Sequence, residues 1–253
     1  MQYRNLGKHG LEVPVLCLGT MTFGLQVEEK TSHEILDRAQ EMKLSFLDTA
    51  DAYPLGGTRE TIGETEAIIG RWMNSRGNRD NLIIATKCFA PTHKRPNNRG
   101  LSRKHIMDSV EASLRRLGTD YLDLFVIHAF DPATPMEETL RALDDLVRAG
   151  KIRYIGASTM YAWQFVKMNE LARQAGLTPF ISMQCQLNAA YREEEREMIP
   201  YCISEGIAVT PFSPLARGLL TGQVNSLRNK TDNFTADQYG DETSHNIAQA
   251  VAQ

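Results

Sequence analysis

Hydrophobic and polar positions along the chain follow two alternating rhythms. Short apolar runs, of the length of a buried strand, lie at residues 15–18, 45–47, 82–86, 122–127, 153–155, 180–183 and 207–210. Apolar residues that return every three or four positions, as on one face of a helix, fill residues 32–42, 60–74, 103–116, 137–149, 162–175 and 193–205. These β/α units, repeated at a spacing of roughly 30 residues, predict a parallel sheet joined by right-handed crossovers.

The residues that flank these segments support the same assignment. Ser102 stands where a helix N-cap is expected. Residues 2–14, in which the alternation is broken by glycines, predict a small β-hairpin before the first parallel strand. Glycines also close the helical stretches where a left-handed C-cap residue is needed, at Gly118, Gly150, Gly176 and Gly206.

No Gly-x-Gly-x-x-Gly segment follows a strand, which favours a barrel over an open dinucleotide-binding sheet. We therefore predict an α/β fold, a (β/α)8 TIM-type barrel with an N-terminal β-hairpin, as a single domain over residues 1–253. The pattern supplies seven strands, so an eighth strand and the last helix are expected to be lacking, with two strand edges left unpaired. Residues 217–244 predict a long polar loop, and residues 246–252 the start of another helix.

Composition narrows the range of partners. A net charge of −3 gives no reason to expect nucleic acid or an anionic membrane as a partner. No apolar run approaches the roughly 18 residues that span a bilayer, and the first residues lack a signal-peptide pattern, so we expect a cytoplasmic protein. The widely spaced cysteines predict reduced, buried thiols rather than disulfides or a metal site; they are Cys17, Cys88, Cys185 and Cys202.

Protonatable residues stand where three successive predicted strands end. Asp48, Lys87 and His128 directly follow the second, third and fourth strands, and Tyr53 lies in the loop after Asp48. The carboxyl ends of parallel strands meet at one mouth of a barrel, which is where such folds place their chemistry. Each side chain alone has an ordinary structural explanation, such as a cap or a surface lysine. Their joint occurrence at one mouth indicates an active site.

Together these four groups predict acid–base chemistry at an oxygen atom. A free phenol has a pKa of about 10, and a nearby Lys87 ammonium would lower that of Tyr53. Asp48 would keep Lys87 charged, and His128 would donate a hydrogen bond to a carbonyl oxygen bound next to Tyr53. The chain has no nucleophile-elbow serine motif and no His-Glu-x-x-His metal motif. The simplest reaction at the carbon atom of the carbonyl group is therefore transfer of a hydride from a nicotinamide.

Aromatic residues lie near the same strand ends. Phe23, Phe89 and Phe130 follow the first, third and fourth strands and predict contacts with an apolar or aromatic carbonyl substrate. Trp72 and Trp163 occur at helical spacings, and we interpret both as packing residues.

Residues 1–222 resemble an aldo-keto reductase, of the bacterial and fungal branch that is also similar to aryl-alcohol dehydrogenases and to voltage-gated potassium channel β subunits. This resemblance implies a (β/α)8 barrel that reduces aldehydes and ketones with NADPH, using Asp48, Tyr53, Lys87 and His128. The motifs that carry it are Leu18-Gly19-Thr20-Met21, Phe46-Leu47-Asp48-Thr49-Ala50-Asp51-Ala52-Tyr53, Ala85-Thr86-Lys87, Val126-Ile127-His128, Ile155-Gly156-Ala157-Ser158 and Pro211-Phe212-Ser213-Pro214-Leu215-Ala216-Arg217-Gly218.

The resemblance also implies a set of cofactor contacts. Ser158 and Gln184 would hold the carboxamide of the nicotinamide, and Phe212 would stack on its ring. The pyrophosphate would be approached by Ser213, Leu215 and Gly218, with Arg217 as a charge partner. The remaining implied contacts are Gly19, Thr20, Met21, Asp48 and Thr159.

The resemblance ends before the segment that binds the adenosine 2′-phosphate of NADPH in the family. Three explanations are open: the chain is a fragment, it binds the cofactor weakly, or another segment takes this place. The predicted function is reduction of a small carbonyl compound. The alternative is a nicotinamide-binding sensor, like the channel β subunits, with weak catalysis.

Overall fold

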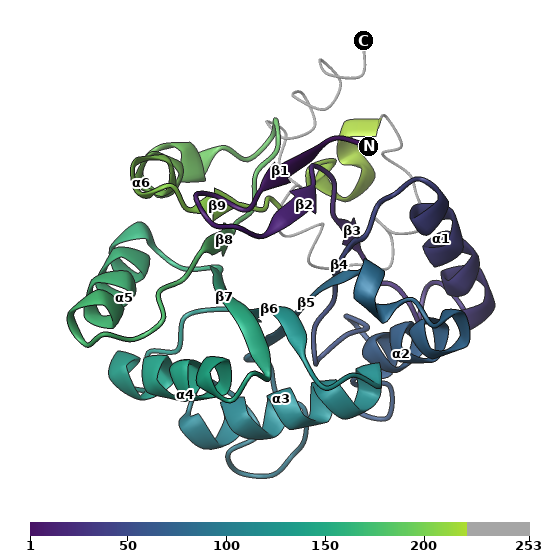
Figure 1. Cartoon of the computed structure of the whole chain (residues 1–253), viewed down its shortest axis with the longest axis horizontal. Helices are drawn as coiled ribbons and strands as arrows, with labels where there is room; N and C mark the ends of the chain where they lie inside the picture. Colours follow the sequence, from purple (N-terminus) through teal and green to yellow (C-terminus); the bar gives the residue numbers. More distant parts are fainter. Residues whose placement is uncertain (222–253) are drawn as a thin grey trace. The chain divides into compact units, whose positions relative to one another are not determined.

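The computed structural model of this protein describes residues 1–221 (Figure 1). The chain divides into two compact units, Met1–Ser182 and Met183–Gln253, and each is described by itself. The single domain expected over residues 1–253 stays a prediction. The predicted loop over residues 217–244 lies largely outside the described residues, and the predicted helix start over residues 246–252 lies wholly outside them.

The first unit begins with the predicted hairpin, in which β1 (Tyr3–Asn5) and β2 (Glu12–Pro14) pair antiparallel. The predicted strand at residues 15–18 starts too early, because the Val15 N–H still donates to the Gln2 carbonyl beside the hairpin at 3.0 Å. Parallel strands then lie side by side in chain order: β3 (Leu18–Gly19), β4 (Phe46–Asp48), β5 (Ile83–Cys88), β6 (Leu122–Ile127) and β7 (Ile152–Ser158).

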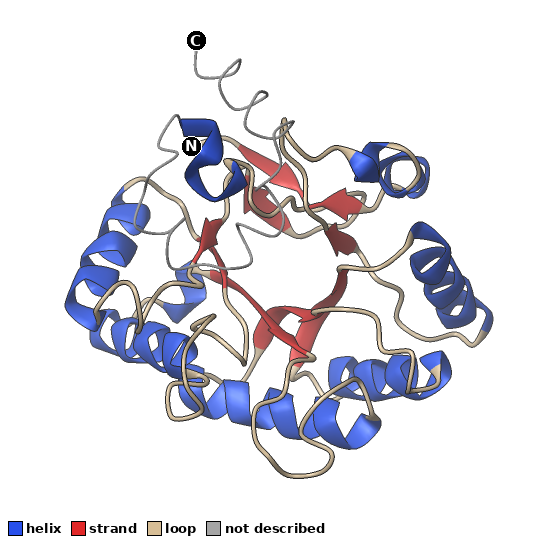
Figure 2. Ribbon diagram, turned by 180° about the vertical axis from the view of Figure 1, so that it is seen from behind, coloured by secondary structure: helices blue, strands red, loops and turns tan. Residues whose placement is uncertain are grey.

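Helices cover the outer face of these strands, as the red strands and surrounding blue helices of Figure 2 show. Ser102 is a true N-cap, since its hydroxyl accepts a hydrogen bond from the His105 N–H at 3.3 Å. The predicted start at residue 60 is wrong, because Gly63 has a left-handed backbone (φ 84°) and the helix begins after it. The helical elements are α1 (Glu29–Glu41), α2 (Glu64–Arg76), η1 (Arg79–Asn81), α3 (Arg103–Leu117), α4 (Met136–Arg148) and α5 (Ala162–Gln174).

Strand alternation decides which side chains face the interior of the sheet. On β5, Thr86 contacts Glu66 of α2, whereas Lys87 contacts Asp48 at the end of β4. Even-numbered residues of β5 therefore face the helices and Lys87 faces inward. The helix layer is close-packed: a Cβ added at Gly70 of α2 would lie 2.2 Å from the Arg116 carbonyl oxygen of α3, so these two helices meet at backbone contact.

The second unit contains all but the first residue of β8 (Ser182–Gln184), followed by η2 (Glu193–Glu195), α6 (Met198–Glu205), β9 (Ala208–Val209) and η3 (Ala216–Thr221). The predicted helix over residues 193–205 is wrong at its start. Pro200 cannot donate a backbone hydrogen bond and fits only the first turn of a helix, so α6 begins just before it. The strand–helix alternation of the two units confirms the predicted α/β fold class of a partial TIM-type barrel with an N-terminal hairpin.

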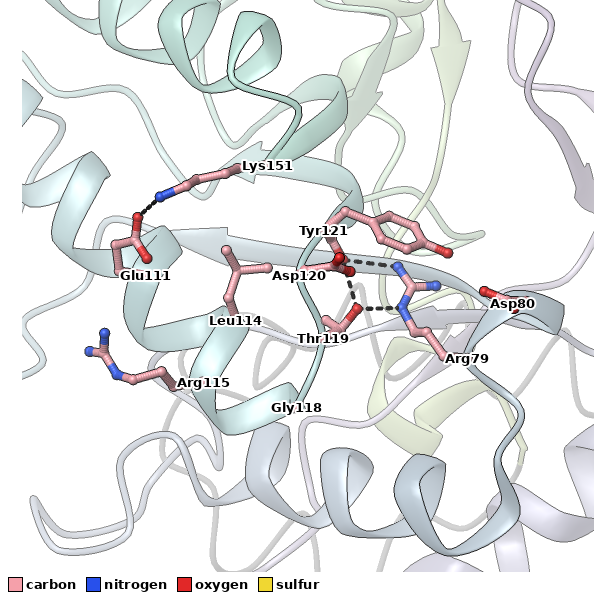
Figure 3. Close-up of a pocket in the computed structure, with 10 residues that line it drawn as sticks. All are labelled: Arg79, Asp80, Glu111, Leu114, Arg115, Gly118, Thr119, Asp120, Tyr121 and Lys151. Carbon is pink, nitrogen blue, oxygen red and sulfur yellow. Dashed lines mark hydrogen bonds and ion pairs between the residues drawn. The ribbon is translucent and has the colours of Figure 1, made fainter.

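A hollow of about 630 Å³ lies at the amino ends of β5, β6 and β7 (Figure 3). Both Arg79 and Lys151, which line it, already have an acidic partner. The Arg79 guanidinium lies 4.0 Å from the centre of the Tyr121 ring and donates to Asp123 at 2.7 Å, and Lys151 forms an ion pair with Glu111. Polar groups at this end of a β/α barrel usually serve stability, and we assign that role to these.

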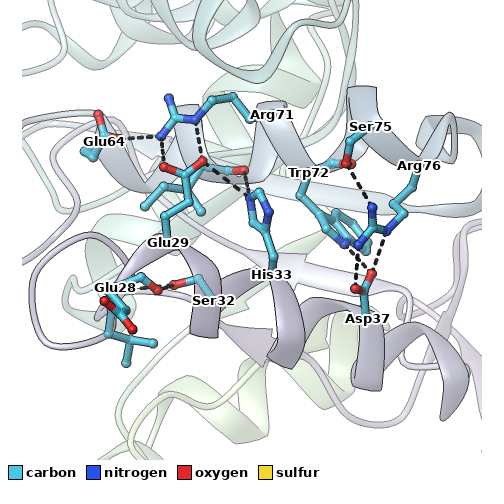
Figure 4. A network of polar contacts seen from close by, with 12 residues as sticks. Glu28, Glu29, Ser32, His33, Asp37, Glu64, Arg71, Trp72, Ser75 and Arg76 are labelled. Atoms are coloured by element: carbon cyan, nitrogen blue, oxygen red, sulfur yellow. Dashed lines mark hydrogen bonds and ion pairs between the residues drawn. The ribbon is translucent and has the colours of Figure 1, made fainter.

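Polar contacts also join α1 to α2 (Figure 4). Arg71 donates to both oxygens of Glu29, at 2.6 and 2.9 Å. The indole N–H of Trp72 donates to Asp37 at 2.8 Å, and its ring is buried. The prediction that Trp72 packs in the interior is therefore confirmed.

Candidate active site

The Lys87 ammonium is the centre of the candidate site. It is fully buried and donates to Asp48 Oδ2 at 2.6 Å and to the carbonyl oxygen of Thr49 at 2.7 Å. Burial alone would lower the pKa of Lys87, but the charges of Asp48 and Tyr53 and the hydrogen bond to Asp48 raise it above its ordinary value. Lys87 therefore carries a positive charge inside the strand layer at physiological pH.

Tyr53 and His128 lie beside this charge. The Lys87 nitrogen is 5.0 Å from the centre of the Tyr53 ring, and the rings of Tyr53 and His128 meet edge to face with centroids 5.7 Å apart. Burial, and secondly the charge of Lys87, lower the pKa of His128 to about 3, so its imidazole is neutral at physiological pH. A neutral imidazole carries one N–H donor and one acceptor nitrogen. The structure thus brings together all four side chains that the strand ends predict.

Backbone hydrogen bonds fix the loops that carry these groups. Thr20, at the end of β3, donates its N–H and its hydroxyl to the Asp48 carbonyl, at 3.0 and 2.9 Å. The Tyr53 N–H donates to the Ala50 carbonyl at 3.2 Å, and the Tyr53 carbonyl accepts from the Gly63 N–H at 2.9 Å. The backbone of Tyr53 is consequently held both through its N–H and through its carbonyl. The Thr49 carbonyl could not have been identified from sequence, because its partner Lys87 becomes a neighbour only in the folded sheet.

The predicted cofactor contacts of the first unit differ in exposure. Thr20 and Ser158 are buried, Met21 is half-buried, and Gly19 and Thr159 are exposed. The hydroxyls of Ser158 and Thr159 lie 3.1 Å apart at the end of β7, and Thr159 has a left-handed backbone (φ 46°). Both hydroxyls therefore sit at the carboxyl edge of the sheet.

The remaining predicted cofactor contacts belong to the second unit. Gln184 and Phe212 are half-buried, and Phe212 donates its N–H to the Cys185 carbonyl at 2.9 Å. The segment that follows has left-handed backbone at Ser213 and at three successive residues, Ala216 to Gly218. Within it, Leu215 is 56% exposed and Gly218 and Ser213 are half-buried, whereas Arg217 is buried. In this segment the Ala216 N–H donates to the Ser213 carbonyl and the Gly218 N–H donates to the Leu215 carbonyl, both at 2.9 Å.

Among the predicted substrate contacts, Phe89 and Phe130 are half-buried, whereas Phe23 is only 3% exposed and offers almost no surface to a ligand. The interpretation of Trp163 as a packing residue is wrong: its side chain is 58% exposed and meets the Phe130 ring edge to face at 6.4 Å. Its place in the first turn of α5, directly after β7, was the signal available in the sequence, because that turn lies at the mouth. Neighbouring Tyr161 is 73% exposed.

The cysteines among residues 1–221 are all free. Cys88, Cys185 and Cys202 are buried as predicted, but Cys17 is exposed, as is neighbouring Leu16. Within the same described residues, no three metal-ligating side chains gather in one place. None of the helices described there combines the length and the apolar character that crossing a bilayer requires.

Comparisons with known proteins agree with this geometry. The model of the aldo/keto reductase family matches residues 15–251. The chain is 39% identical to versiconal hemiacetal acetate reductase of Aspergillus parasiticus, over 92% of this chain and 73% of the relative. It is 42% identical to norsolorinic acid reductase stcV of Emericella nidulans, over 83% of this chain and 56% of the relative. It is 39% identical to the uncharacterized oxidoreductase YrpG of Bacillus subtilis, over 88% and 69%. The chain belongs to the aldo/keto reductase family.

Proposed function

We propose that this oxidoreductase, which acts on carbonyl or alcohol groups, reduces an aldehyde or ketone to an alcohol with NADPH, and that Tyr53 is the general acid. One observation carries the proposal: a buried, ion-paired ammonium, a phenol ring and a neutral imidazole converge at the carboxyl ends of β4, β5 and β6. Such a site can protonate an oxygen atom while its carbon is reduced.

The chain's own residues have separate tasks in this proposal. The bound nicotinamide supplies the hydride. Tyr53 donates its proton to the carbonyl oxygen, and the Lys87 ammonium stabilises the phenolate that remains. Asp48 holds that ammonium in place. His128, which is neutral because its pKa is about 3, donates an N–H hydrogen bond to the same oxygen and orients it.

The residues present fit a nicotinamide dinucleotide. In the first unit, the Ser158 and Thr159 hydroxyls would hold the carboxamide. In the second unit, Gln184 would be a cofactor contact. Phe212 would stack on the nicotinamide ring. In the second unit, the left-handed segment would hold the pyrophosphate through Ser213, Leu215, Arg217 and Gly218. In the first unit, the further cofactor contacts would be Gly19, Thr20, Met21 and Asp48. Free thiols among residues 1–221 fit a reducing, cytoplasmic setting for this reaction.

An aromatic carbonyl compound is the substrate class that we propose. Phe89 and Phe130 are partly open at the mouth, and Trp163 extends this aromatic surface outward. Aromatic side chains pack against the rings of a ligand in offset-stacked or edge-to-face arrangements. We assign no substrate contact to Phe23 in this structure, because almost none of its surface is open.

The test is the Tyr53→Phe variant, assayed by NADPH oxidation with a panel of aromatic aldehydes. Turnover should fall by about 10² or more, the usual worth of a positioned general acid, while NADPH binding by fluorescence titration stays unchanged. Tyr3→Phe is a matched control, since Tyr3 is exposed on the hairpin. Wild-type turnover in Tyr53→Phe would remove Tyr53 from the mechanism. A single turnover without steady oxidation by the wild-type protein would favour a nicotinamide sensor instead.

A further inference from the structure

Two carboxyl groups are buried together behind β5, on the side opposite Lys87. Asp51 is 1% exposed and Glu66, on α2, is fully buried. We call them the buried acid pair. Among residues 1–221, the cation that faces them is the guanidinium of Arg116 on α3. Two buried carboxylates with one positive charge are not neutralised, and an uncompensated buried charge is costly.

Glu66 takes nearly all the available hydrogen bonds. Its Oε1 accepts from the Thr86 hydroxyl at 2.5 Å, and its Oε2 accepts from Arg116 Nε and Nη2 at 2.7 and 2.6 Å. Neither oxygen of Asp51 accepts a well-formed hydrogen bond from any residue of the described part of the chain. Glu66 therefore holds the ion pair and the hydrogen bonds, and Asp51 is the member of the pair that keeps a proton.

The other groups around Asp51 do not change this assignment. Burial is the first cause that raises the pKa of Asp51, to about 8, and the charge of Glu66 is the second. Arg116, the Ser109 hydroxyl and the Ala52 N–H lower it by less. The Cys88 thiol on β5 is neutral, because burial and Asp51 raise its pKa well above the ordinary value.

Behind Ser109 lies one further titratable group, His105 on α3. Its Nε2 is 3.4 Å from the Ser109 hydroxyl, and burial lowers its pKa below the ordinary value. His105 is thus neutral at physiological pH and supplies no positive charge to Asp51.

The backbone of Asp51 links this pair to the candidate site. Asp51 lies in the loop between Asp48 and Tyr53, and its N–H donates to the Lys87 carbonyl at 3.0 Å. In the same loop the Thr49 N–H donates to the Ala85 carbonyl at 2.9 Å. The loop therefore continues along the end of β5. A charge on Asp51 would repel Glu66 and draw the loop toward water.

We propose that Asp51 is a positioning residue that acts as a neutral acid: its uncharged carboxyl, packed beside Glu66 and Arg116, keeps the loop of Asp48 and Tyr53 seated on β5. The inference depends on the proposed function only because the same loop carries Tyr53. Loss of the proton, and not loss of the side chain alone, should release the loop.

The protonation state is tested first, in the unmodified protein, by ¹³C NMR titration of the Asp51 carboxyl. A midpoint near pH 8 is expected, and a midpoint near 4 would overturn the proposal. Melting of Asp51→Asn gives a second measure, since asparagine copies the neutral acid. A carboxyl whose folded pKa lies above its unfolded value of about 3.9 costs stability as pH rises between the two values. The wild-type midpoint should therefore fall progressively below that of Asp51→Asn from pH 5 to 8; a constant difference would contradict the proposal.

Seating of the loop is tested by hydrogen exchange at the amides of residues 49–53, without any assay of activity. Above pH 8 these amides should exchange faster in the wild-type protein than in Asp51→Asn at the same pH, and equally at pH 6. Asp51→Ala, which leaves a cavity, should exchange faster at both. Equal exchange in the wild-type protein and Asp51→Asn at pH 9 would overturn the positioning role. An inactive but normally titrating protein would count against the proposed function alone.

Discussion

Lys87 Nζ lies 2.6 Å from Asp48 Oδ2, and no part of the lysine side chain is open to solvent. A buried ion pair of this kind is weak support for stability, because removing both charges from water costs about as much as their attraction returns. Its effect here is to fix a positive charge 5.0 Å from the centre of the Tyr53 ring. The pair therefore bears on acidity at the site more than on folding.

Asp48→Asn tests this relationship. The amide keeps the shape of the carboxylate but loses its charge, so the pKa of Lys87, which Asp48 helps to raise above its ordinary value, should fall. An opposite charge this close changes the pKa of its partner by about 1–3, and the alkaline limb of the kcat–pH profile should move to lower pH by a similar amount. Asp80→Asn, at an exposed carboxylate near the amino ends of the strands, is the control. An unchanged pH profile in Asp48→Asn would show that the carboxylate does not govern the charge of Lys87.

The lowered pKa of His128 predicts that the protein becomes less stable in acid. Burial and the charge of Lys87 lower its pKa in the folded protein to about 3, below the unfolded value of about 6.5. The unfolded chain then binds more protons between these values, so stability is lost as pH falls from 6.5 toward 3, by up to about 1.4 kcal/mol per pH unit. In urea unfolding, the free energy of unfolding of the wild-type protein should fall steadily relative to that of His128→Gln as the pH is lowered over this range. A difference that stays the same from pH 7 to 4 would mean that His128 titrates normally.

The sequence predicted which side chains gather in the candidate site, because they stand at the ends of strands. Asp48, Lys87 and His128 each follow a strand, and parallel strands bring such positions to one edge whatever the details of packing. Tyr53 was predicted because it stands five residues after Asp48, in the loop that follows the same strand. The order of the elements and the Ser102 cap also depend on local signals, and both were predicted.

The burial and the pKa values of individual side chains could not be predicted, because they depend on residues that are far away in the sequence and close only in the fold. Asp51 stands in the same motif as Asp48, but the pKa of its carboxyl is raised to about 8, first by burial and secondly by the charge of Glu66 on α2, which is a neighbour only in the folded protein. The exposure of Cys17 likewise depends on which segments cover β3, and local periodicity carries no such information. The early start predicted for α6 is different, because the signal of Pro200 was present in the sequence.

Trp163 offers the sharpest test of the substrate class. Its ring is 58% exposed at the start of α5 and meets Phe130 edge to face, so an aromatic substrate bound near Phe130 can extend onto it. Stacking of this kind contributes about 0.5–1.5 kcal/mol, which corresponds to a roughly 2–10-fold rise in KM for aromatic aldehydes in Trp163→Ala. The KM for a short aliphatic aldehyde should stay the same, because such a substrate does not reach the indole. Trp163→Phe keeps a ring face and should restore most of the affinity for aromatic aldehydes. A loss shared equally by aromatic and aliphatic substrates would point to damage to the α5 start rather than to a contact, and no change in either would place Trp163 outside the substrate path.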